Sequence, residues 1–218
     1  CIIMEERGDS DRITVPKETL LRLPKYYEYL KAADQEGACS ISSTKIAEDM
    51  HLNSVLVRKD LAMISSVSGK PRIGFNVKEL MEDMENFLGY NNLSEALLVG
   101  VGSLGRALLS YEGFKEYGLN IVMAFDIDGN IVGEKVNGIN IFHTDKLEYL
   151  AKRLNIKMGI IATPKQVAQS ICDRMIDAGI LAIWNFAPVH LTVPKDVILK
   201  DENLAASLAL LCMQLPKS

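Results

Sequence analysis

The sequence predicts an α/β protein in which an N-terminal winged helix-turn-helix domain precedes a Rossmann-type, doubly wound parallel sheet. Three observations lead to this prediction. Short amphipathic helices fill the first third of the chain, apolar strands alternate with helices after it, and a glycine-rich loop joins the first of these strands to its helix. At 218 residues the chain is long enough for two modest domains.

Composition and charge narrow the class of protein. No apolar run reaches the roughly 18 residues that a transmembrane helix needs, so we expect no membrane partner. The four cysteines form no C-x-x-C pair and the start CIIMEERGDSD shows no secretory signal, which together favour a reduced, cytoplasmic protein. The net charge is −4, but residues 13–78 carry ten basic and seven acidic side chains, a net charge of +3. This local excess of positive charge is compatible with a nucleic-acid partner for the N-terminal third, despite the negative total charge.

Helical periodicity begins near the N-terminus. Leu20, Leu23, Tyr27 and Leu30 recur at spacings of three and four residues. Such spacing places apolar side chains on one face and predicts a helix from residue 16 to about residue 33.

Two short helices follow, separated by a few residues, and form a helix-turn-helix candidate. Ser42 and Ser43 offer N-caps for the first helix, and Asn53 caps the second, SVLVRKDLAMI. In a DNA major groove, the start of the second helix would approach base edges, and its basic side chains would reach bases or phosphates. The predicted DNA-binding residues on these helices are Ser43, Thr44, Asn53, Ser54, Arg58 and Lys59.

The segment from Ser65 to Val77 contains Ser-Gly, Pro and Gly and predicts a small β-hairpin, or wing. Lys70 and Arg72 on this wing would contact phosphates or an adjacent minor groove. The residues leave an alternative open, because Arg58-Lys59-Asp60 is also a common surface triplet. The N-terminal third would then be a small helical cap with solvated charges.

Residues Leu97 to Leu109, LLVGVGSLGRALL, contain the spacing G-x-G-x-x-G between an apolar strand and a helix. A dinucleotide-binding loop requires this setting, although the spacing alone also describes a glycine-rich turn without a ligand. Gly100 would permit the tight turn, Gly102 would let a pyrophosphate approach, and Gly105 would let helix and strand pack closely. The helix N-terminus would offer N–H groups to the phosphates. The predicted phosphate-binding residues are Gly100, Val101, Gly102, Ser103, Leu104 and Gly105.

An acidic residue after the next strand completes the pattern. Residues 120–125 form the strand, Asp126 follows it, and Ile127 is a further predicted cofactor contact. A carboxylate at this position accepts hydrogen bonds from ribose hydroxyls and repels a 2′-phosphate. The pattern therefore predicts NADH and NAD⁺ as cofactors, in preference to their phosphorylated counterparts.

Three more apolar strands continue the alternation, at residues 139–142, 157–162 and 180–184. Strands that alternate with helices in this way predict a parallel sheet, whose ligands bind beyond the carboxyl ends of the strands. Two pairs of residues directly follow such strands, so we expect them to lie near the nicotinamide: Thr163-Pro164 and Asn185-Phe186.

The last segment, NLAASLALLCMQL, has apolar residues on nearly all faces of a helix. A helix of this kind must be buried, and it is too short to span a membrane. We therefore expect it to be buried between two subunits.

Together, the motifs RLPKYYEYL, VRKDLAMI, VGVGSLGRAL and NFAPVHLTVP resemble the Rex family of bacterial redox-sensing transcriptional repressors. The resemblance extends from about Val15 to Leu215. It implies a homodimer that binds an A·T-rich palindromic operator through its winged-helix domains and is released when NADH binds its Rossmann domains. It also implies a recognition pair at Arg58 and Lys59, a Phe186 near the nicotinamide of the partner subunit, and a C-terminal helix exchanged between protomers.

These patterns predict four parts of the chain. We expect a winged-helix domain at residues 13–78, a linker helix at 79–92, a Rossmann domain at 93–200 and a dimerisation helix at 201–218.

Two other functions stay open from the residues alone, a small NAD-dependent oxidoreductase and a CoA-binding module. An oxidoreductase needs a general acid or base near the nicotinamide. His143 ends a strand and could lie there, but no Lys, Tyr or Ser partner is evident around it. A CoA-binding module shares the fold but needs no ribose acid such as Asp126. We therefore expect a sensor, with no catalytic residue and no metal ligand.

Overall fold

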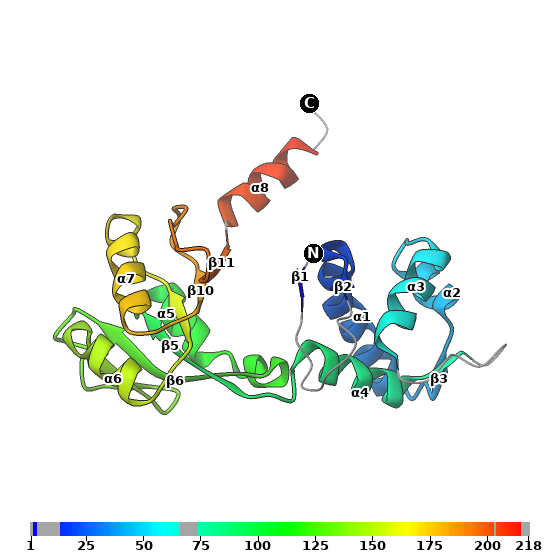
Figure 1. Ribbon diagram of the computed structural model, residues 1–218, viewed down its shortest axis with the longest axis horizontal. Coiled ribbons are helices and arrows are strands. Elements are labelled where there is room, and N and C mark those ends of the chain that lie inside the picture. The colour runs from blue at the N-terminus through cyan, green and yellow to red at the C-terminus, as the bar shows by residue number, and fades with distance from the viewer. Residues whose placement is uncertain (1, 4–13, 66–73, 203, 215–218) are drawn as a thin grey trace. The chain divides into compact units, whose positions relative to one another are not determined.

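The computed structural model describes residues 2–3, 14–65, 74–202 and 204–214 (Figure 1). The chain divides into two compact units, unit 1 at Cys1–Asn91 and unit 2 at Asn92–Ser218. Within the described ranges, no helix is both long enough and apolar enough to cross a membrane. Lys70 and Arg72, on the predicted wing, lie outside the described residues.

Unit 1 is mainly helical, with four helices and two short antiparallel strand pairs among its described residues. The helices are α1 (Lys17–Gln35), α2 (Ser43–Asp49), α3 (Ser54–Ile64) and α4 (Val77–Leu88). The strand pairs are β1 (Ile2–Ile3) with β2 (Thr14–Val15), and β3 (Ser40–Ile41) with β4 (Phe75–Asn76). Pair β3–β4 joins the strand before α2 to a strand at the end of the predicted wing segment.

Side-chain caps fix where the helices of the helix-turn-helix begin. The Ser42 hydroxyl accepts a hydrogen bond from the Lys45 N–H at 3.0 Å, and the Asn53 side chain accepts one from the Val55 N–H at 2.8 Å. Each cap satisfies an N–H group that the first helical turn leaves without a backbone partner. The predicted caps Ser42 and Asn53 are therefore confirmed, whereas Ser43, the other candidate, is the first residue of α2.

A small apolar core holds the helices of unit 1 together. Leu23 and Leu30 of α1, Ile46 of α2, Leu61 of α3 and Leu80 of α4 are almost fully buried. Since every helix contributes to this core, the helix-turn-helix is built on a packed support.

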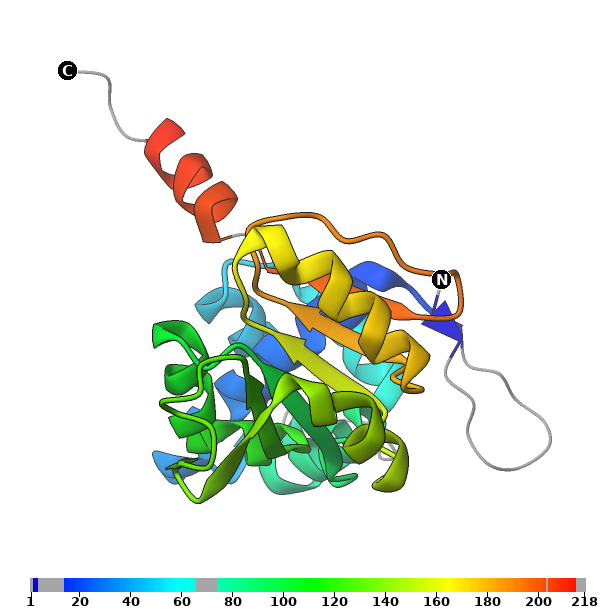
Figure 2. The same cartoon turned by 90° about the vertical axis from the view of Figure 1, so that its left-hand side faces the viewer.

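Unit 2 contains a seven-stranded sheet in the order β11-β10-β9-β5-β6-β8-β7, parallel except for β7 (Figures 1 and 2). The strands are β5 (Ser94–Val99), β6 (Leu119–Asp126), β7 (Lys135–Val136), β8 (Ile139–His143), β9 (Met158–Ile161), β10 (Ala182–Asn185) and β11 (Ile198–Asp201). The chain moves outward in one direction from β5 to β8 and in the other from β9 to β11. This reversal is the switch point of a doubly wound sheet, where ligands bind.

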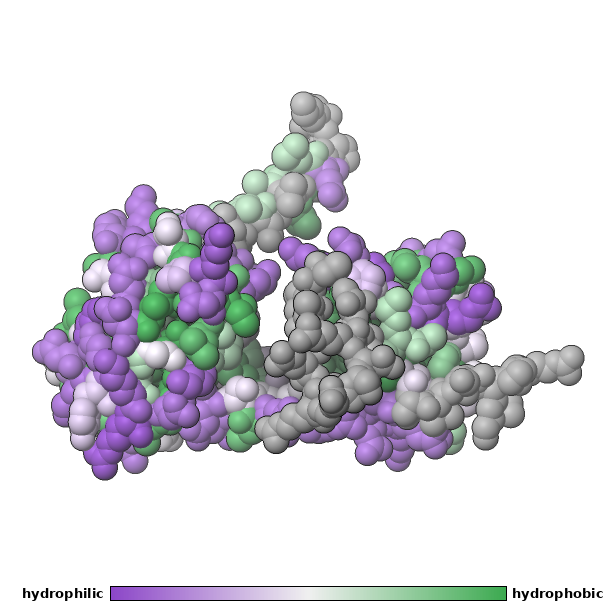
Figure 3. Space-filling view, in the orientation of Figure 1, coloured by the Kyte–Doolittle hydropathy of each residue, from purple (hydrophilic) through white to green (hydrophobic). Residues whose placement is uncertain are grey.

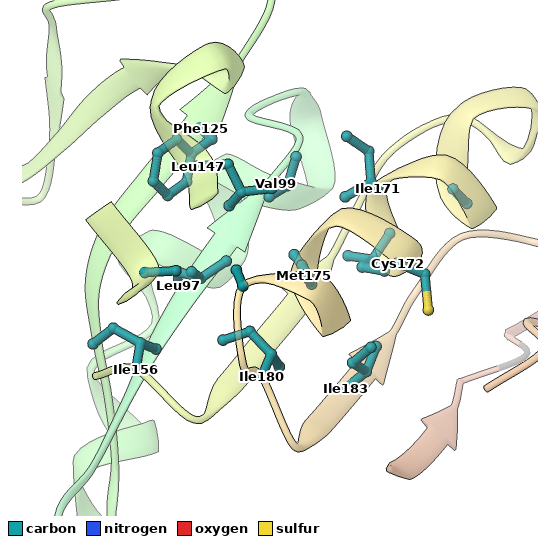
Figure 4. Close-up of a cluster of buried hydrophobic side chains, with 14 of the residues drawn as sticks. Leu97, Val99, Phe125, Leu147, Ile156, Ile171, Cys172, Met175, Ile180 and Ile183 are labelled. Carbon is teal, nitrogen blue, oxygen red and sulfur yellow. The ribbon is translucent and has the colours of Figure 1, made fainter. Parts of the chain in front are cut away.

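Helices cover the two faces of the sheet. One face carries α6 (Leu147–Arg153), which follows the short η2 turn (Thr144–Lys146), and α7 (Lys165–Asp177). Figure 4 shows side chains of these helices packed on strand residues, among them Cys172 and Met175 of α7 near Ile183 of β10. The other face carries α5 (Ser103–Ser110) and η1 (Glu112–Tyr117). The predicted Rossmann-type architecture is confirmed.

Helix α8 (Leu204–Met213) ends the described chain and differs from the other helices. Leu208, Leu211 and Met213 are 61%, 65% and 81% exposed, and apolar residues line the helix in Figure 3. A helix with this composition is ordinarily buried. Its burial against a second subunit stays a prediction, because the structure holds a single chain.

Candidate functional site

The glycine loop between β5 and α5 is shaped by two positions that accept only glycine. Gly100 has a φ of +99°, and a Cβ atom there would lie 2.6 Å from the carbonyl oxygen of Ala162. A Cβ atom on Gly105 would lie 1.9 Å from the carbonyl oxygen of Gly100. Any side chain would therefore separate α5 from the loop, or the loop from the end of β9.

Gly102 differs from these two glycines, because a Cβ atom there would meet nothing within 4 Å. The open space lies at the N-terminus of α5, where first-turn N–H groups have no intrahelical partner. Ser103 and Leu104 are exposed beside it, and Val101 is buried beneath the loop. A phosphate group could approach this backbone closely and accept hydrogen bonds from it.

Asp126 ends β6 next to the glycine loop, and backbone hydrogen bonds hold its carboxylate. One oxygen accepts from the Val101 N–H at 2.7 Å, and the other accepts from the N–H groups of Ile127 and Asp128 at 2.7 and 3.0 Å. The exposed Ile127 presents an apolar side chain directly after the acid. This arrangement leaves the carboxylate and the Ile127 side chain beside the open glycine loop.

Thr163 lies at the end of β9, against the glycine loop. Its side chain is only 8% exposed, yet its hydroxyl oxygen has no hydrogen-bond partner among the described residues. A buried hydroxyl without a partner costs free energy, so such a group in a native fold is expected to meet a ligand or water. Pro164 follows; it is exposed and occupies the N-cap position of α7.

Asn185 ends β10 and Phe186 follows it, and the two side chains have different surroundings. The Asn185 side chain is fully buried and donates to the Val189 carbonyl and the Asp201 carboxylate, both at 2.8 Å. Its polar atoms are therefore occupied by the protein. Phe186 is half-buried, with its ring centroid 4.7 Å from that of Trp184 and its N–H bonded to the Ile161 carbonyl.

The residues predicted to bind DNA lie at the starts of α2 and α3 and along α3. Of the predicted residues that the structure describes, Ser43 is half-buried and the others are exposed: Thr44, Asn53, Ser54, Arg58 and Lys59. Among the described residues, none forms an ion pair with Arg58 or Lys59. These two cations are therefore available to an anionic partner, as the recognition-helix prediction requires.

Asp60, the next residue along α3, faces the opposite way. It is 2% exposed and accepts hydrogen bonds from the guanidinium of Arg22 at 2.7 and 3.0 Å. The hydroxyls of Thr19 and Tyr26 donate to it at 2.9 Å each. Burial raises the pKa of Asp60, but these hydrogen bonds outweigh burial and hold the pKa below its ordinary value.

Sequence reasoning missed this buried network. Arg58-Lys59-Asp60 also reads as an exposed triplet, yet Asp60 shares the apolar stripe of α3 with Val57 and Leu61. That position in the helical repeat was the available signal. The network fixes α3 on α1 and leaves Arg58 and Lys59 at the surface.

Two family models match this chain. Residues 14–62 match the model described as "Putative DNA-binding protein N-terminus", and residues 91–189 match the model described as "CoA binding domain". Neither match covers half of the chain, but their positions agree with unit 1 and unit 2.

Curated relatives and solved structures match nearly the whole chain. The redox-sensing transcriptional repressor Rex of Bacteroides thetaiotaomicron is 40% identical over 201 residues, which cover 92% of this chain and 91% of the relative. The repressor of the same name from Treponema denticola is 41% identical over 190 residues, covering 87% and 90%. The structure of RSP in complex with beta-NAD+ and operator DNA has a TM-score of 0.87 at 33% identity and covers 92% of each chain.

A second RSP structure, in complex with beta-NADH, has a TM-score of 0.84 at the same identity and covers 92% of this chain and 93% of that one. RSP is itself described as a Rex-family repressor. The relatives are thus named as regulators of transcription and not as enzymes. Identity of this extent through both units means that the chain belongs to the Rex family of redox-sensing transcriptional repressors.

Proposed function

We propose that this chain binds operator DNA as a homodimer through unit 1 and that NADH bound at unit 2 lowers its affinity for the operator. The observation that carries the proposal is that identity to the named repressors covers 92% of the chain and so includes both units. RSP, a similar repressor, has been solved in complex with beta-NAD+ and operator DNA and in complex with beta-NADH. We assign the protein to the cytoplasm, where bacterial operators are found.

The residues at the carboxyl end of the unit 2 sheet fit an NAD cofactor. The open space over Gly102 would admit the pyrophosphate, the Asp126 carboxylate would hold the adenosine ribose, and the unpaired Thr163 hydroxyl would gain a partner. Ser103 and Leu104 would lie along the phosphates, Ile127 against the adenine, and Pro164 and Phe186 on the nicotinamide side. The cofactor supplies a ring that carries a positive charge when oxidised and none when reduced.

Asp126 also favours NADH over CoA, the ligand in the description of the family model that matches unit 2. Its carboxylate would lie close to the ribose and would repel a phosphate carried there. CoA carries a phosphate on its ribose and NADH does not. Substitution of Asp126 by Ala should therefore weaken NADH binding and reduce the preference for NADH over NADPH.

Helix α3 is the element of unit 1 best suited to read DNA. Arg58 and Lys59 carry positive charge that no ion pair with another described residue neutralises, and Asn53 and Ser54 lie at the helix N-terminus. In a major groove these side chains would reach base edges, with Ser43 and Thr44 of α2 nearer to the phosphates. Lys70 and Arg72 of the predicted wing would add phosphate contacts.

Two features favour a homodimer: the symmetry of a palindromic operator and the exposed apolar surface of α8. A palindromic operator presents two half-sites, which two copies of unit 1 would occupy. The exposed apolar side chains of α8 would be buried against the partner, in agreement with the exchanged helix that the family resemblance implies.

The proposal is tested by titrating operator DNA with the protein in saturating NADH and, separately, in saturating NAD⁺. We expect weaker operator binding with NADH by about 5- to 150-fold, the ordinary range of coupling between two sites. Operator DNA should weaken NADH binding by the same factor, because coupling is reciprocal. Equal operator affinity with both cofactors would contradict the proposal.

A further inference from the structure

A cluster of hydrogen bonds links the loop after β10 to the end of β11, and we call it the 184–202 cluster. Its members are Trp184, Asn185, His190, Asp201 and Glu202. Phe186, the first residue of this loop, donates its N–H to the carbonyl of Ile161 at the end of β9, two residues before Thr163. The cluster therefore begins at the cofactor side of unit 2.

Asn185 is the buried centre of the cluster. It lies opposite Asp201 in the parallel register of β10 and β11, and its amide donates to the Asp201 carboxylate at 2.8 Å. The same amide donates to the Val189 carbonyl, and its oxygen accepts from the Ala187 N–H at 2.9 Å. One fully buried side chain thus fixes the loop and attaches it to β11.

The remaining contacts attach the residues just before α8. The second Asp201 oxygen pairs with the exposed His190 imidazole at 2.7 Å. The Glu202 N–H donates to the Asn185 carbonyl at 2.8 Å, and its carboxylate accepts from the Trp184 indole at 3.1 Å. Since α8 begins at Leu204, these are contacts at the root of that helix.

We propose that Asn185 and Asp201 are positioning residues that pass a change at the cofactor site to α8. This inference rests on the proposed function. A ligand can shift a conformational equilibrium only through an element that differs between the two states, and the 185–190 loop lies between the nicotinamide side and the root of α8. The Asn185 amide bonds both Val189 of the loop and Asp201 of β11, so a displacement of the loop would reach the root of α8 through this side chain as well as through the strand ladder. Neither side chain needs to contact cofactor or DNA for this role.

The first test compares Asp201→Ala with its parent by the ratio of operator dissociation constants in NADH and in NAD⁺. We expect this ratio to fall at least about fivefold, while NADH binding without DNA stays within about threefold, because coupling and binding are separate quantities. The matched control is His190→Ala, which removes only the exposed partner of Asp201 and should keep the ratio. An unchanged ratio in Asp201→Ala, or an equal loss in His190→Ala, would overturn the proposal.

A second pair of variants tests the hydrogen bond itself. N185D places two acceptors opposite each other, so the loop and β11 should separate and the ratio should fall. The double variant N185D/D201N restores one donor and one acceptor with their roles exchanged, and we expect it to recover most of the ratio. A double variant no better than N185D contradicts the proposal.

Trp184 gives a readout that does not depend on DNA, because it is the single tryptophan of the chain. In protein labelled with 5-fluorotryptophan, the one fluorine resonance should differ between the NADH and NAD⁺ complexes of the parent. The difference between the two complexes should be smaller in Asp201→Ala than in the parent. If the operator affinity of the parent is the same with NADH and with NAD⁺, the proposed function is contradicted. If the parent and Asp201→Ala show the same difference in operator affinity between the two cofactors, only the role of the 184–202 cluster is contradicted.

Discussion

Two buried polar groups, Asp60 in unit 1 and Thr163 in unit 2, differ in whether the protein supplies a partner for them. In unit 1, Asp60 is surrounded by donors from Arg22, Thr19 and Tyr26, so the charge is paired within the domain. In unit 2, the hydroxyl of Thr163 is buried without a partner among the described residues. Both groups lie close to the residues assigned to binding.

This difference follows from what each unit is proposed to bind. A helix that reads DNA must hold its side chains in place before the DNA arrives, and a closed network on its inner side achieves that. A site that surrounds a small ligand leaves some polar groups for the ligand to satisfy. A buried polar group that is paired within its own domain therefore indicates a supporting network, whereas one without such a partner indicates a ligand site.

The largest expected effect comes from breaking the unit 1 network. Asp60→Ala leaves the half-buried Arg22 guanidinium and the hydroxyls of Thr19 and Tyr26 without their common acceptor. We expect a loss of about 3–5 kcal/mol, because a hydrogen bond to a charged group contributes about 1.5–3 kcal/mol and several are lost together. Urea unfolding of the variant and the parent measures this loss. Arg58→Ala, on the exposed side of the same helix, is the control and should stay within about 0.5 kcal/mol of the parent. A loss below about 1 kcal/mol for Asp60→Ala would show that the network does not support α3.

The network should also respond to acid. The pKa of Asp60 lies below its unfolded value of about 3.9, so its stabilisation is complete above that pH and is lost as the pH falls through the folded pKa. The difference in unfolding free energy between the parent and Asp60→Asn should therefore shrink below about pH 4. A difference that stays constant from pH 7 to pH 3 would contradict this assignment.

The glycine loop of unit 2 should tolerate little change at Gly105. An Ala there would place its Cβ against the Gly100 carbonyl, and we expect a loss of about 3 kcal/mol and failure to bind NADH. Gly129→Ala is the control, since a Cβ atom there would meet nothing within 4 Å. Thermal unfolding followed by NADH titration measures both properties. A stable Gly105→Ala variant that binds NADH normally would contradict the assignment of this loop.

Gly102→Ala should separate ligand binding from stability. Its Cβ would fill the open space over the loop, so the unfolding temperature should stay near that of the parent. NADH binding should weaken at least about tenfold, or about 1.4 kcal/mol, because the pyrophosphate could no longer approach. Unaltered NADH affinity would place the pyrophosphate elsewhere.

The smallest effect concerns Thr163. Thr163→Val replaces the unpaired hydroxyl by a methyl group of similar size, so the protein without cofactor should be as stable as the parent or slightly more so. NADH binding should weaken by about 1 kcal/mol, the ordinary contribution of one hydrogen bond. Calorimetric unfolding without NADH measures the change in stability, and unfolding with NADH measures the change in NADH binding. A variant that is less stable and binds NADH normally would mean that the hydroxyl supports the fold.

The sequence was sufficient for features that depend on local pattern. Ser42 and Asn53 cap the predicted helices, and the glycine spacing and Asp126 lie together at the end of the sheet. Each of these follows from residues close in sequence, or from the regular order of strands in a doubly wound sheet.

The features that sequence could not supply join distant residues. Asp60 bonds to Arg22 across 38 positions, and Asn185 bonds to Asp201 across 16. Asn185 is a predicted cofactor contact because it follows a strand, yet the partner of its side chain depends on which strand lies beside β10. Pairing of this kind is decided by the tertiary fold and not by local periodicity.

Because of helix α8, the assembly of this protein should depend on its own concentration. The apolar side chains of Leu208, Leu211 and Met213 are exposed in one chain, so their stabilising free energy is gained only when chains associate. By mass action, a dilute protein would populate separate chains, and a more abundant one would populate assembled pairs with higher thermal stability. The number of copies in a cell would then set how much of the repressor is competent, independently of the cofactor.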